Sequence, residues 1–152
     1  MTKHKQYKAK MLIFEGPDKV GKSTLIKKIN EITNYEFFCI DRFTGSAWVY
    51  DKLTGRRNIT DELIKIEKEF SQLKNLKIIN ILLRCDSKVL RQRIIQEDGY
   101  SKLRIHELNE TIKLYHKYLA KVSCLPIIVI DTTNKTITQT AAEILKKITQ
   151  YE

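Results

Sequence analysis

The sequence of 152 residues predicts an α/β fold in which a short, mostly parallel sheet carries helices on both faces. Short continuous apolar runs, typical of strands buried on both faces, alternate along the chain with longer segments whose apolar residues recur at helical spacing. No linker rich in Pro, Gly or Ser divides this alternation, and the length suits one domain of ordinary size. We therefore expect a single domain over residues 1–152.

Four apolar runs have the length of strands rather than of helices. They are residues 11–14, 37–40, 78–83 and 126–130. The first run leads directly into Glu15, and no run approaches the roughly 18 apolar residues needed to cross a bilayer. We expect neither a membrane span nor a secretion signal.

The segments between these runs show the spacing of helices. Apolar residues recur every three or four positions over about residues 21–32, 48–53, 63–70, 87–99, 103–122 and 138–148. Thr60 or Asp61 can cap the third of these helices, and Asp86 or Ser87 can cap the fourth.

The chain is strongly basic. Lys and Arg number 28 against 18 Asp and Glu, a formal net charge of +10. Such a charge favours anionic partners, namely nucleotides, nucleic acid or an anionic surface. A solvated lysine-rich surface explains the same excess equally well, because lysines lie on nearly every predicted helix. Residues 1–9 form a basic N-terminal tail that can be flexible.

The cysteines indicate a reducing compartment. Cys39, Cys85 and Cys124 lie far apart and match no metal-binding spacing. Three widely spaced cysteines are typical of reduced thiols at core or strand-end positions. We therefore expect a cytoplasmic protein.

The bend after the first apolar run contains a phosphate-binding sequence. Residues 16–23 match the P-loop pattern, in which two glycines separated by four residues are followed by Lys and Ser or Thr. The glycines permit close approach of the backbone, whose N–H groups, with the start of the next helix, turn onto phosphate oxygens. Lys22 supplies a positive charge for the β- and γ-phosphates, and Ser23 a hydroxyl for Mg²⁺.

This motif extends the prediction to a three-layer P-loop NTPase fold that binds ATP and Mg²⁺. The expected nucleotide-binding residues are Gly16, Pro17, Asp18, Lys19, Val20, Gly21, Lys22, Ser23 and Thr24.

Three stretches resemble thymidylate kinases and related deoxynucleotide and deoxynucleoside kinases, and in particular their small phage-type members. LIFEGPDKVGKSTLIKKI resembles the opening of that family, including its Glu-Gly-x-Asp element. Asp41-Arg42-Phe43, followed by Ser46, looks like the family's Asp-Arg-aromatic motif. More weakly, the run 78–83 followed by an acidic residue and two arginines is similar to the strand and arginine-bearing lid of the family.

The resemblance implies a role for each matched residue of the loop. Lys22, Ser23 and the loop backbone would hold the phosphates of ATP. Asp18 matches an acidic residue that faces the sugar of the acceptor. Lys19 stands where some members carry a catalytic arginine.

The resemblance also implies roles outside the loop. Arg42 would bind the phosphate of the acceptor and bring it in line with the γ-phosphate. Asp41 would hold the Mg²⁺ shell through water, so Ser23 and Asp41 are the expected metal-site residues. Arg93, or its neighbour Arg91, would close over the transferred phosphoryl group. The expected catalytic residues are Lys19, Lys22, Asp41, Arg42 and Arg93.

The chain departs from the family in its acceptor region. Family members usually have another strand and helix before the Asp-Arg strand, whereas residues 29–41 leave room for one strand here. We therefore expect about four strands instead of five and an incomplete base pocket. Phe43, Trp48 and Tyr50 could stack on a base, although Trp48 fits a helix core equally well.

These features predict an ATP-dependent phosphotransferase that acts on a deoxynucleoside monophosphate. Such an acceptor is already ionised, whereas a hydroxyl acceptor benefits from a general base, for which Asp18 and Asp41 are candidates. Three alternatives stay open: a kinase that phosphorylates a hydroxyl of polymeric nucleic acid at a modified base or a terminus, a nucleoside kinase, and a non-catalytic nucleotide-dependent binding module. A homodimer is compatible with each.

Overall fold

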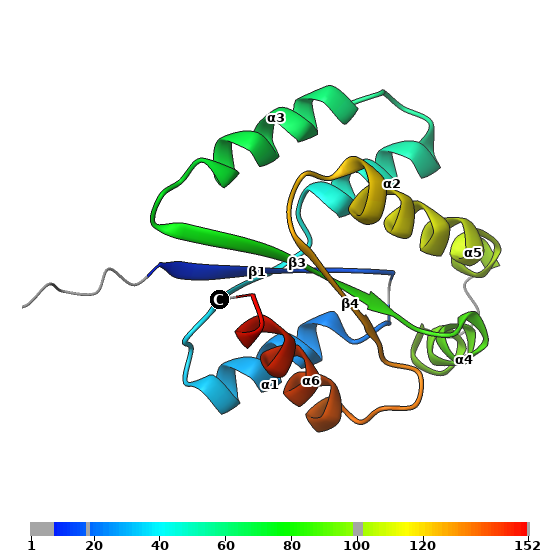
Figure 1. The fold of residues 1–152 in the computed structure, drawn as a ribbon. Helices are drawn as coiled ribbons and strands as arrows, with labels where there is room; N and C mark the ends of the chain where they lie inside the picture. Colours follow the sequence, from blue (N-terminus) through cyan, green and yellow to red (C-terminus); the bar gives the residue numbers. More distant parts are fainter. Residues whose placement is uncertain (1–7, 18, 99–101, 152) are drawn as a thin grey trace, which may run out of the picture.

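The computed structural model describes residues 8–17, 19–98 and 102–151, and its strands form one parallel sheet (Figure 1). In spatial order the strands are β2 (Phe38–Asp41), β1 (Ala9–Glu15), β3 (Leu76–Arg84) and β4 (Ile127–Asp131). Each neighbouring pair is parallel. The prediction of about four mostly parallel strands is confirmed.

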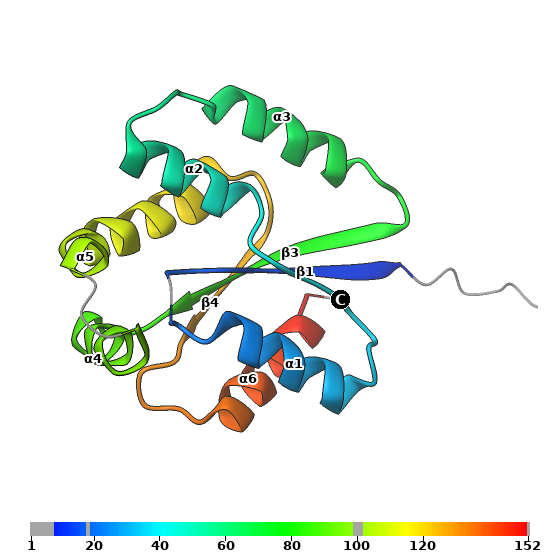
Figure 2. The same cartoon turned by 180° about the vertical axis from the view of Figure 1, so that it is seen from behind.

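Helices cover both faces of the sheet (Figure 1 and Figure 2). They are α1 (Lys22–Thr33), α2 (Thr44–Thr54), α3 (Thr60–Ser71), α4 (Ser87–Asp98), α5 (Lys102–Lys117), which continues into a π-helical turn (Tyr118–Val122), and α6 (Ile137–Thr149). α1 and α6 lie side by side on one face, and α2, α3 and α5 cover the other. α4 lies beside the carboxyl ends of the strands. This is the predicted three-layer arrangement.

The first apolar run forms the centre of the sheet. Residues 11–14 are each at most 1% exposed. In the register of the sheet, Met11 lies between Phe38 of β2 and Ile78 of β3. A strand with neighbours on both sides and helices on both faces has no polar side, which is why this run is continuous rather than alternating.

The prediction of a fully buried strand at residues 37–40 is wrong. Among the described strands, β2 has β1 as its single neighbour, and Phe38 is 60% exposed. A short apolar run is compatible with either an edge or a central strand, because the order of strands depends on which segments pair.

The expected N-terminal tail over residues 1–9 is also too long. β1 begins at Ala9, whose N–H donates to the carbonyl oxygen of Asn75 at 2.9 Å. Residues 1–7 lie outside the described part of the chain.

The helix ends follow the sequence in part. Asp86 caps α4 as predicted, since its Oδ1 accepts the N–H of Lys88 at 2.8 Å. Thr60 is instead the first residue of α3, and Asn58 Oδ1 accepts its N–H at 3.2 Å. α2 begins at Thr44, four residues before the predicted start. The prediction missed this first turn because the turn is polar and carries no apolar pattern.

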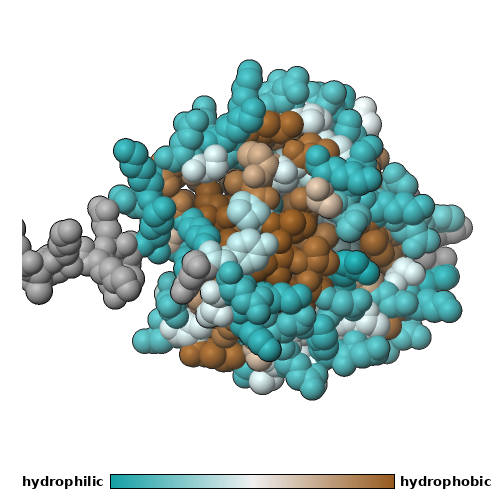
Figure 3. Space-filling view, viewed as in Figure 1, coloured by the Kyte–Doolittle hydropathy of each residue, from teal (hydrophilic) through white to brown (hydrophobic). Residues whose placement is uncertain are grey.

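Exposed apolar residues lie on several elements, among them Ile32 on α1, Phe38 on β2 and Ile66 on α3. Figure 3 shows polar residues over the two helical layers and apolar residues between them, where β4 forms the sheet edge. Within the part of the chain that the structure describes, no helix combines the length and apolar character needed to span a bilayer.

The three cysteines are free thiols, as their spacing predicts.

Candidate active site

The P-loop sequence joins the carboxyl end of β1 to the start of α1. β1 ends at Glu15 and α1 begins at Lys22, so residues 16–21 form the bend. Gly16 has a φ of +150°, and a Cβ added there would lie 2.8 Å from the carbonyl oxygen of Leu83 on β3. Only glycine therefore allows the loop to pass directly against the neighbouring strand.

Lys22 places its ammonium group inside this bend. The residue is 6% exposed, and its Nζ donates to the carbonyl oxygens of Gly16 at 2.7 Å and Pro17 at 2.9 Å. A buried ammonium group is stable only where oxygen atoms accept hydrogen bonds from it, and these two carbonyl oxygens do so. The loop thus holds a positive charge at the end of the central strand.

The N-terminus of α1 opens onto the same bend. Its N-cap residue, Gly21, has φ +103°, and the first turn receives no side-chain cap from the described residues. The first N–H groups of a helix have no partner within the helix and carry the positive end of its dipole. Ser23 and Thr24 of this turn are exposed. The helix end and the ammonium together form a site suited to phosphate.

The Asp-Arg motif lies next to this bend because β2 pairs with β1. Asp41 is the exposed last residue of β2 and lies opposite Phe14 in the register. The N–H of Arg42 donates to the carbonyl oxygen of Phe14 at 3.0 Å. The Arg42 guanidinium lies 5.3 Å from the centre of the Tyr50 ring, within the range of a cation–π contact. Two motifs separated in the sequence thus meet at one end of the sheet.

Arg93, rather than Arg91, reaches the loop. Arg93 is half-buried on α4, and its Nη1 donates to the carbonyl oxygen of Lys19 at 3.3 Å, whereas Arg91 is exposed. Of the two lid arginines that the resemblance suggests, the structure brings Arg93 to the bend between β1 and α1.

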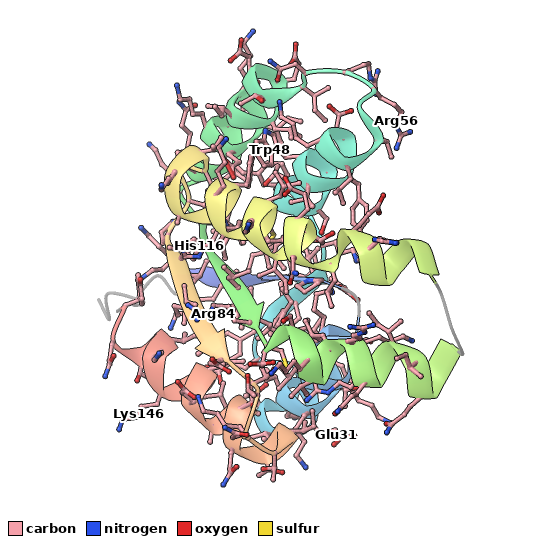
Figure 4. All side chains as sticks on the ribbon, turned by 90° about the vertical axis from the view of Figure 1, so that its right-hand side faces the viewer. Glu31, Trp48, Arg56, Arg84, His116 and Lys146 are labelled. Atoms are coloured by element: carbon pink, nitrogen blue, oxygen red, sulfur yellow. The ribbon has the colours of Figure 1, made fainter. Side chains whose placement is uncertain are left out.

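Some predicted residues are placed differently or are not described. Asp18 lies outside the described residues. Trp48 is 4% exposed, and its Nε1 donates to Thr60 Oγ1 at 2.9 Å, so it packs in the core and offers no face to a base. Figure 4 shows Trp48 within the helical layer.

Glu15 is a buried carboxylate for which the sequence predicts no role. It is 0% exposed, and it accepts the N–H of Phe43 at 2.5 Å and the hydroxyl of Ser46 at 3.1 Å. Burial raises its pKa from 4.5 to about 7, against smaller opposing effects of these hydrogen bonds and of the Lys22 charge. Its signal in the sequence is a single charged residue that ends a fully apolar run.

A pocket of about 1090 Å³ adjoins the loop between α5 and the carboxyl ends of β3 and β4. Pro17 forms part of its wall. The charged residues that line it are the basic Arg84, Lys113, Lys117, Lys121 and Lys135 and the acidic Asp86 and Asp131. Figure 4 shows Arg84 and His116, another lining residue, on the same side of the molecule. This excess of positive charge suits an anionic ligand.

The residues near the loop fit Mg²⁺ bound together with a nucleotide. No group of three or more His, Cys, Asp or Glu side chains among the described residues could hold a metal ion by itself. Mg²⁺, however, usually keeps several waters and binds through one or two protein oxygens plus phosphates of the substrate. The exposed Ser23 hydroxyl and Asp41 carboxylate are oxygen donors of this kind.

No protein-family model matches the chain, and no curated protein matches it. Several solved structures do. The YorR protein from Bacillus subtilis, solved in complex with phosphorylated GDP, superimposes with a TM-score of 0.70 at 18% identity and covers 91% of this chain and 95% of its own.

Two nucleoside and nucleotide kinases are also similar. Deoxyadenosine kinase from M. mycoides matches with a TM-score of 0.55 at 15% identity, covering 93% of this chain and 100% of its own. Thymidylate kinase from Candida albicans matches with a TM-score of 0.56 at 16% identity, covering 95% and 92%. At these identities the likeness shows the fold, and the chain has the fold of the P-loop kinases.

Proposed function

We propose that this protein is a P-loop kinase that transfers the γ-phosphate of ATP to a deoxynucleoside monophosphate. The observation that carries the proposal is the position of Lys22, whose buried ammonium lies in the bend beside the start of α1, which no side chain of the described residues caps. The Asp41–Arg42 pair lies at the end of the adjacent strand. Phosphoryl transfer requires mainly alignment of donor and acceptor and neutralisation of phosphate charge, and these groups are suited to both.

On the donor side, the loop backbone and Lys22 would hold the β- and γ-phosphates. Lys19 belongs to this loop, and its carbonyl oxygen receives Arg93 from α4. That contact would keep Arg93 close to the transferred group. Mg²⁺, held by Ser23 and Asp41, would neutralise charge on the phosphates when bound. The pocket beside Pro17 has room for the nucleoside part of a nucleotide.

On the acceptor side, Arg42 would bind the phosphate of the monophosphate. A guanidinium makes planar, two-point contacts with phosphate oxygens, and stacking on Tyr50 limits its orientation. A monophosphate needs no general base. The names of two similar structures, a deoxyadenosine kinase with dCMP and dCDP bound and a thymidylate kinase, support an acceptor of the nucleotide class.

One observation favours a second candidate, a kinase that phosphorylates a hydroxyl of polymeric nucleic acid. The pocket beside the loop carries five basic residues against two acidic ones among the described residues, and the whole chain has a net charge of +10. Binding through phosphates weakens steeply with added salt. Failure to bind DNA even at low salt would count against this candidate.

A panel of acceptors tests the proposal. The purified protein is incubated with γ-labelled ATP and Mg²⁺ and with deoxynucleoside monophosphates, deoxynucleosides or oligonucleotides in turn. We expect transfer to at least one monophosphate and none to the other classes. The Lys22→Ala variant should retain the fold by circular dichroism and lose at least about a hundredfold in rate, because its cation acts on the phosphates directly. Transfer that persists near the wild-type rate in this variant would remove the proposed phosphate site.

A further inference from the structure

The first turn of α2 rests on a buried carboxylate that does not take part in the proposed phosphate transfer itself. Glu15 is the last residue of β1 and is fully buried. One carboxylate oxygen accepts the N–H of Phe43 and the other accepts the hydroxyl of Ser46. A buried carboxylate requires such donors, and the positive end of a helix adds to their effect.

These contacts surround Arg42, whose backbone is in an unfavourable conformation. Arg42 has a φ of +71°, which side chains with a Cβ rarely adopt. Its N–H donates to the carbonyl oxygen of Phe14, and the next N–H along the chain, that of Phe43, donates to Glu15. Two successive N–H groups are thus bound to two successive residues of β1. Such a conformation persists only where the surrounding structure holds it.

The carboxylate also packs against the backbone of α2. A Cβ added at Gly45 would collide with Glu15 Oε2 and lie 3.0 Å from its Cδ. Glycine at this position therefore allows the carboxylate to approach the backbone of α2 this closely. An alanine at position 45 would push the Glu15 carboxylate away from the corner between β2 and α2.

A third element completes the arrangement. Ser46 Oγ lies 2.8 Å from the hydroxyl of Tyr115 on α5. When Ser46 donates to the ionised Glu15, Tyr115 is the donor to Ser46. Burial raises the pKa of Tyr115 well above its usual value, so it retains the proton it donates. One chain of hydrogen bonds thus joins β1, α2 and α5.

We infer that Glu15 is a positioning residue for Arg42: through Phe43 and Ser46 it holds the corner between β2 and α2 in the conformation that presents the guanidinium to the phosphate of the acceptor. This inference rests on the proposed function. Glu15 touches no substrate; it acts through the backbone on either side of Arg42.

A double-mutant cycle tests the inference at pH 8. Glu15→Gln and Gly45→Ala are each made alone and with Arg42→Ala, and kcat and KM are measured for ATP and for the monophosphate. We expect each single variant to lose about tenfold to a hundredfold in kcat/KM for the monophosphate, with KM for ATP within about twofold of the wild type. In the Arg42→Ala background the same changes should cost nothing further.

Thr44→Val is the matched control. Thr44 lies in the same turn, but its hydroxyl donates to Glu67 rather than to Glu15. The Thr44→Val variant should have an altered free energy of unfolding and an unaltered kcat/KM for the monophosphate. Should Glu15→Gln or Gly45→Ala not fold, Ser46→Ala removes one contact of the carboxylate with little change in volume.

The outcomes separate the inference from the proposed function. The positioning role would be overturned if the loss in kcat/KM of Glu15→Gln or Gly45→Ala multiplied with the loss of Arg42→Ala in the double variant. It would also be overturned if Thr44→Val lost as much in kcat/KM as they do. Either result would leave the kinase proposal intact. An Arg42→Ala variant that transfers phosphate to the monophosphate normally would overturn both the positioning role and the acceptor assignment of Arg42. Losses that disappear in the Arg42→Ala background support the inference.

Discussion

Replacing Glu15 by Gln should change how the stability of the fold depends on pH. The carboxyl group is 0% exposed, and burial raises its pKa from 4.5 to about 7. Two hydrogen bonds and the charge of Lys22 lower the pKa, but by less than burial raises it. Folding therefore favours the protonated form of this residue.

The sign and size follow from proton linkage. Below pH 4.5 Glu15 is protonated in both the folded and the unfolded chain, so its burial as a charge does not lower the free energy of unfolding. Between pH 4.5 and about 7 the unfolded chain binds fewer protons than the folded chain, so stability falls as pH rises. A rise of roughly 2.5 units in pKa corresponds to about 3 kcal/mol in full, of which about 2.5 kcal/mol is lost between pH 5 and pH 8.

Urea denaturation followed by far-ultraviolet circular dichroism measures this effect. The free energy of unfolding is determined for the wild type and Glu15→Gln at pH 5 and at pH 8. We expect the variant to gain about 2.5 kcal/mol relative to the wild type between the two pH values. The hydrogen bonds that Glu15 accepts are stronger when it is ionised, and this pH-dependent part is already contained in its pKa of about 7. Only the effects of the substitution that do not depend on pH cancel in the comparison.

Glu143→Gln provides the control. Its hydrogen bond and charge contacts with Lys135 and Lys147 hold the pKa of Glu143 below 4.5, so the carboxylate stays ionised across the measured range. Its stability relative to the wild type should be nearly constant from pH 5 to pH 8. A Glu15→Gln difference that is equally constant would refute the reasoning, because it would mean that the buried carboxyl titrates as it does in the unfolded chain.

Three further predictions concern the proposed active site. Gly16→Ala should weaken ATP binding at least about tenfold by calorimetry, because the new Cβ would meet the Leu83 carbonyl. Gly55→Ala is the control: a Cβ at Gly55 would meet no atom within 4 Å, but the residue has φ +61°, so the variant should lose about 1 kcal/mol of stability and keep its ATP affinity. Equal ATP affinities of the Gly16→Ala and Gly55→Ala variants would contradict the expectation for Gly16. Arg42→Lys should lower kcat/KM for the monophosphate at least about tenfold in steady-state assays, since an ammonium lacks the planar two-point contact, and wild-type kinetics would exclude that contact. Excess chelator should abolish transfer in the same assay, and full turnover without Mg²⁺ would remove the assignment of Ser23 and Asp41.

The local parts of the fold and the site are visible in the sequence. The apolar run at residues 11–14 predicts a buried strand, which the structure confirms as the central strand β1. The spacing of glycines, Lys22 and Ser23 predicts a bend between a strand and a helix, which the structure also shows, and phosphate binding by this bend stays a prediction. The same local logic predicts the cap that Asp86 provides for α4. These features need no knowledge of which segments meet.

The tertiary structure alone decides which residues meet. The apolar pattern cannot distinguish the edge strand β2 from a central strand, and it does not separate Arg93, which reaches the loop, from the exposed Arg91. Glu15 and Tyr115 are 100 residues apart, and no motif relates them until β1, α2 and α5 pack together. Chain order records neighbours along the backbone, whereas burial of a charge and the donors that satisfy it come from neighbours in space.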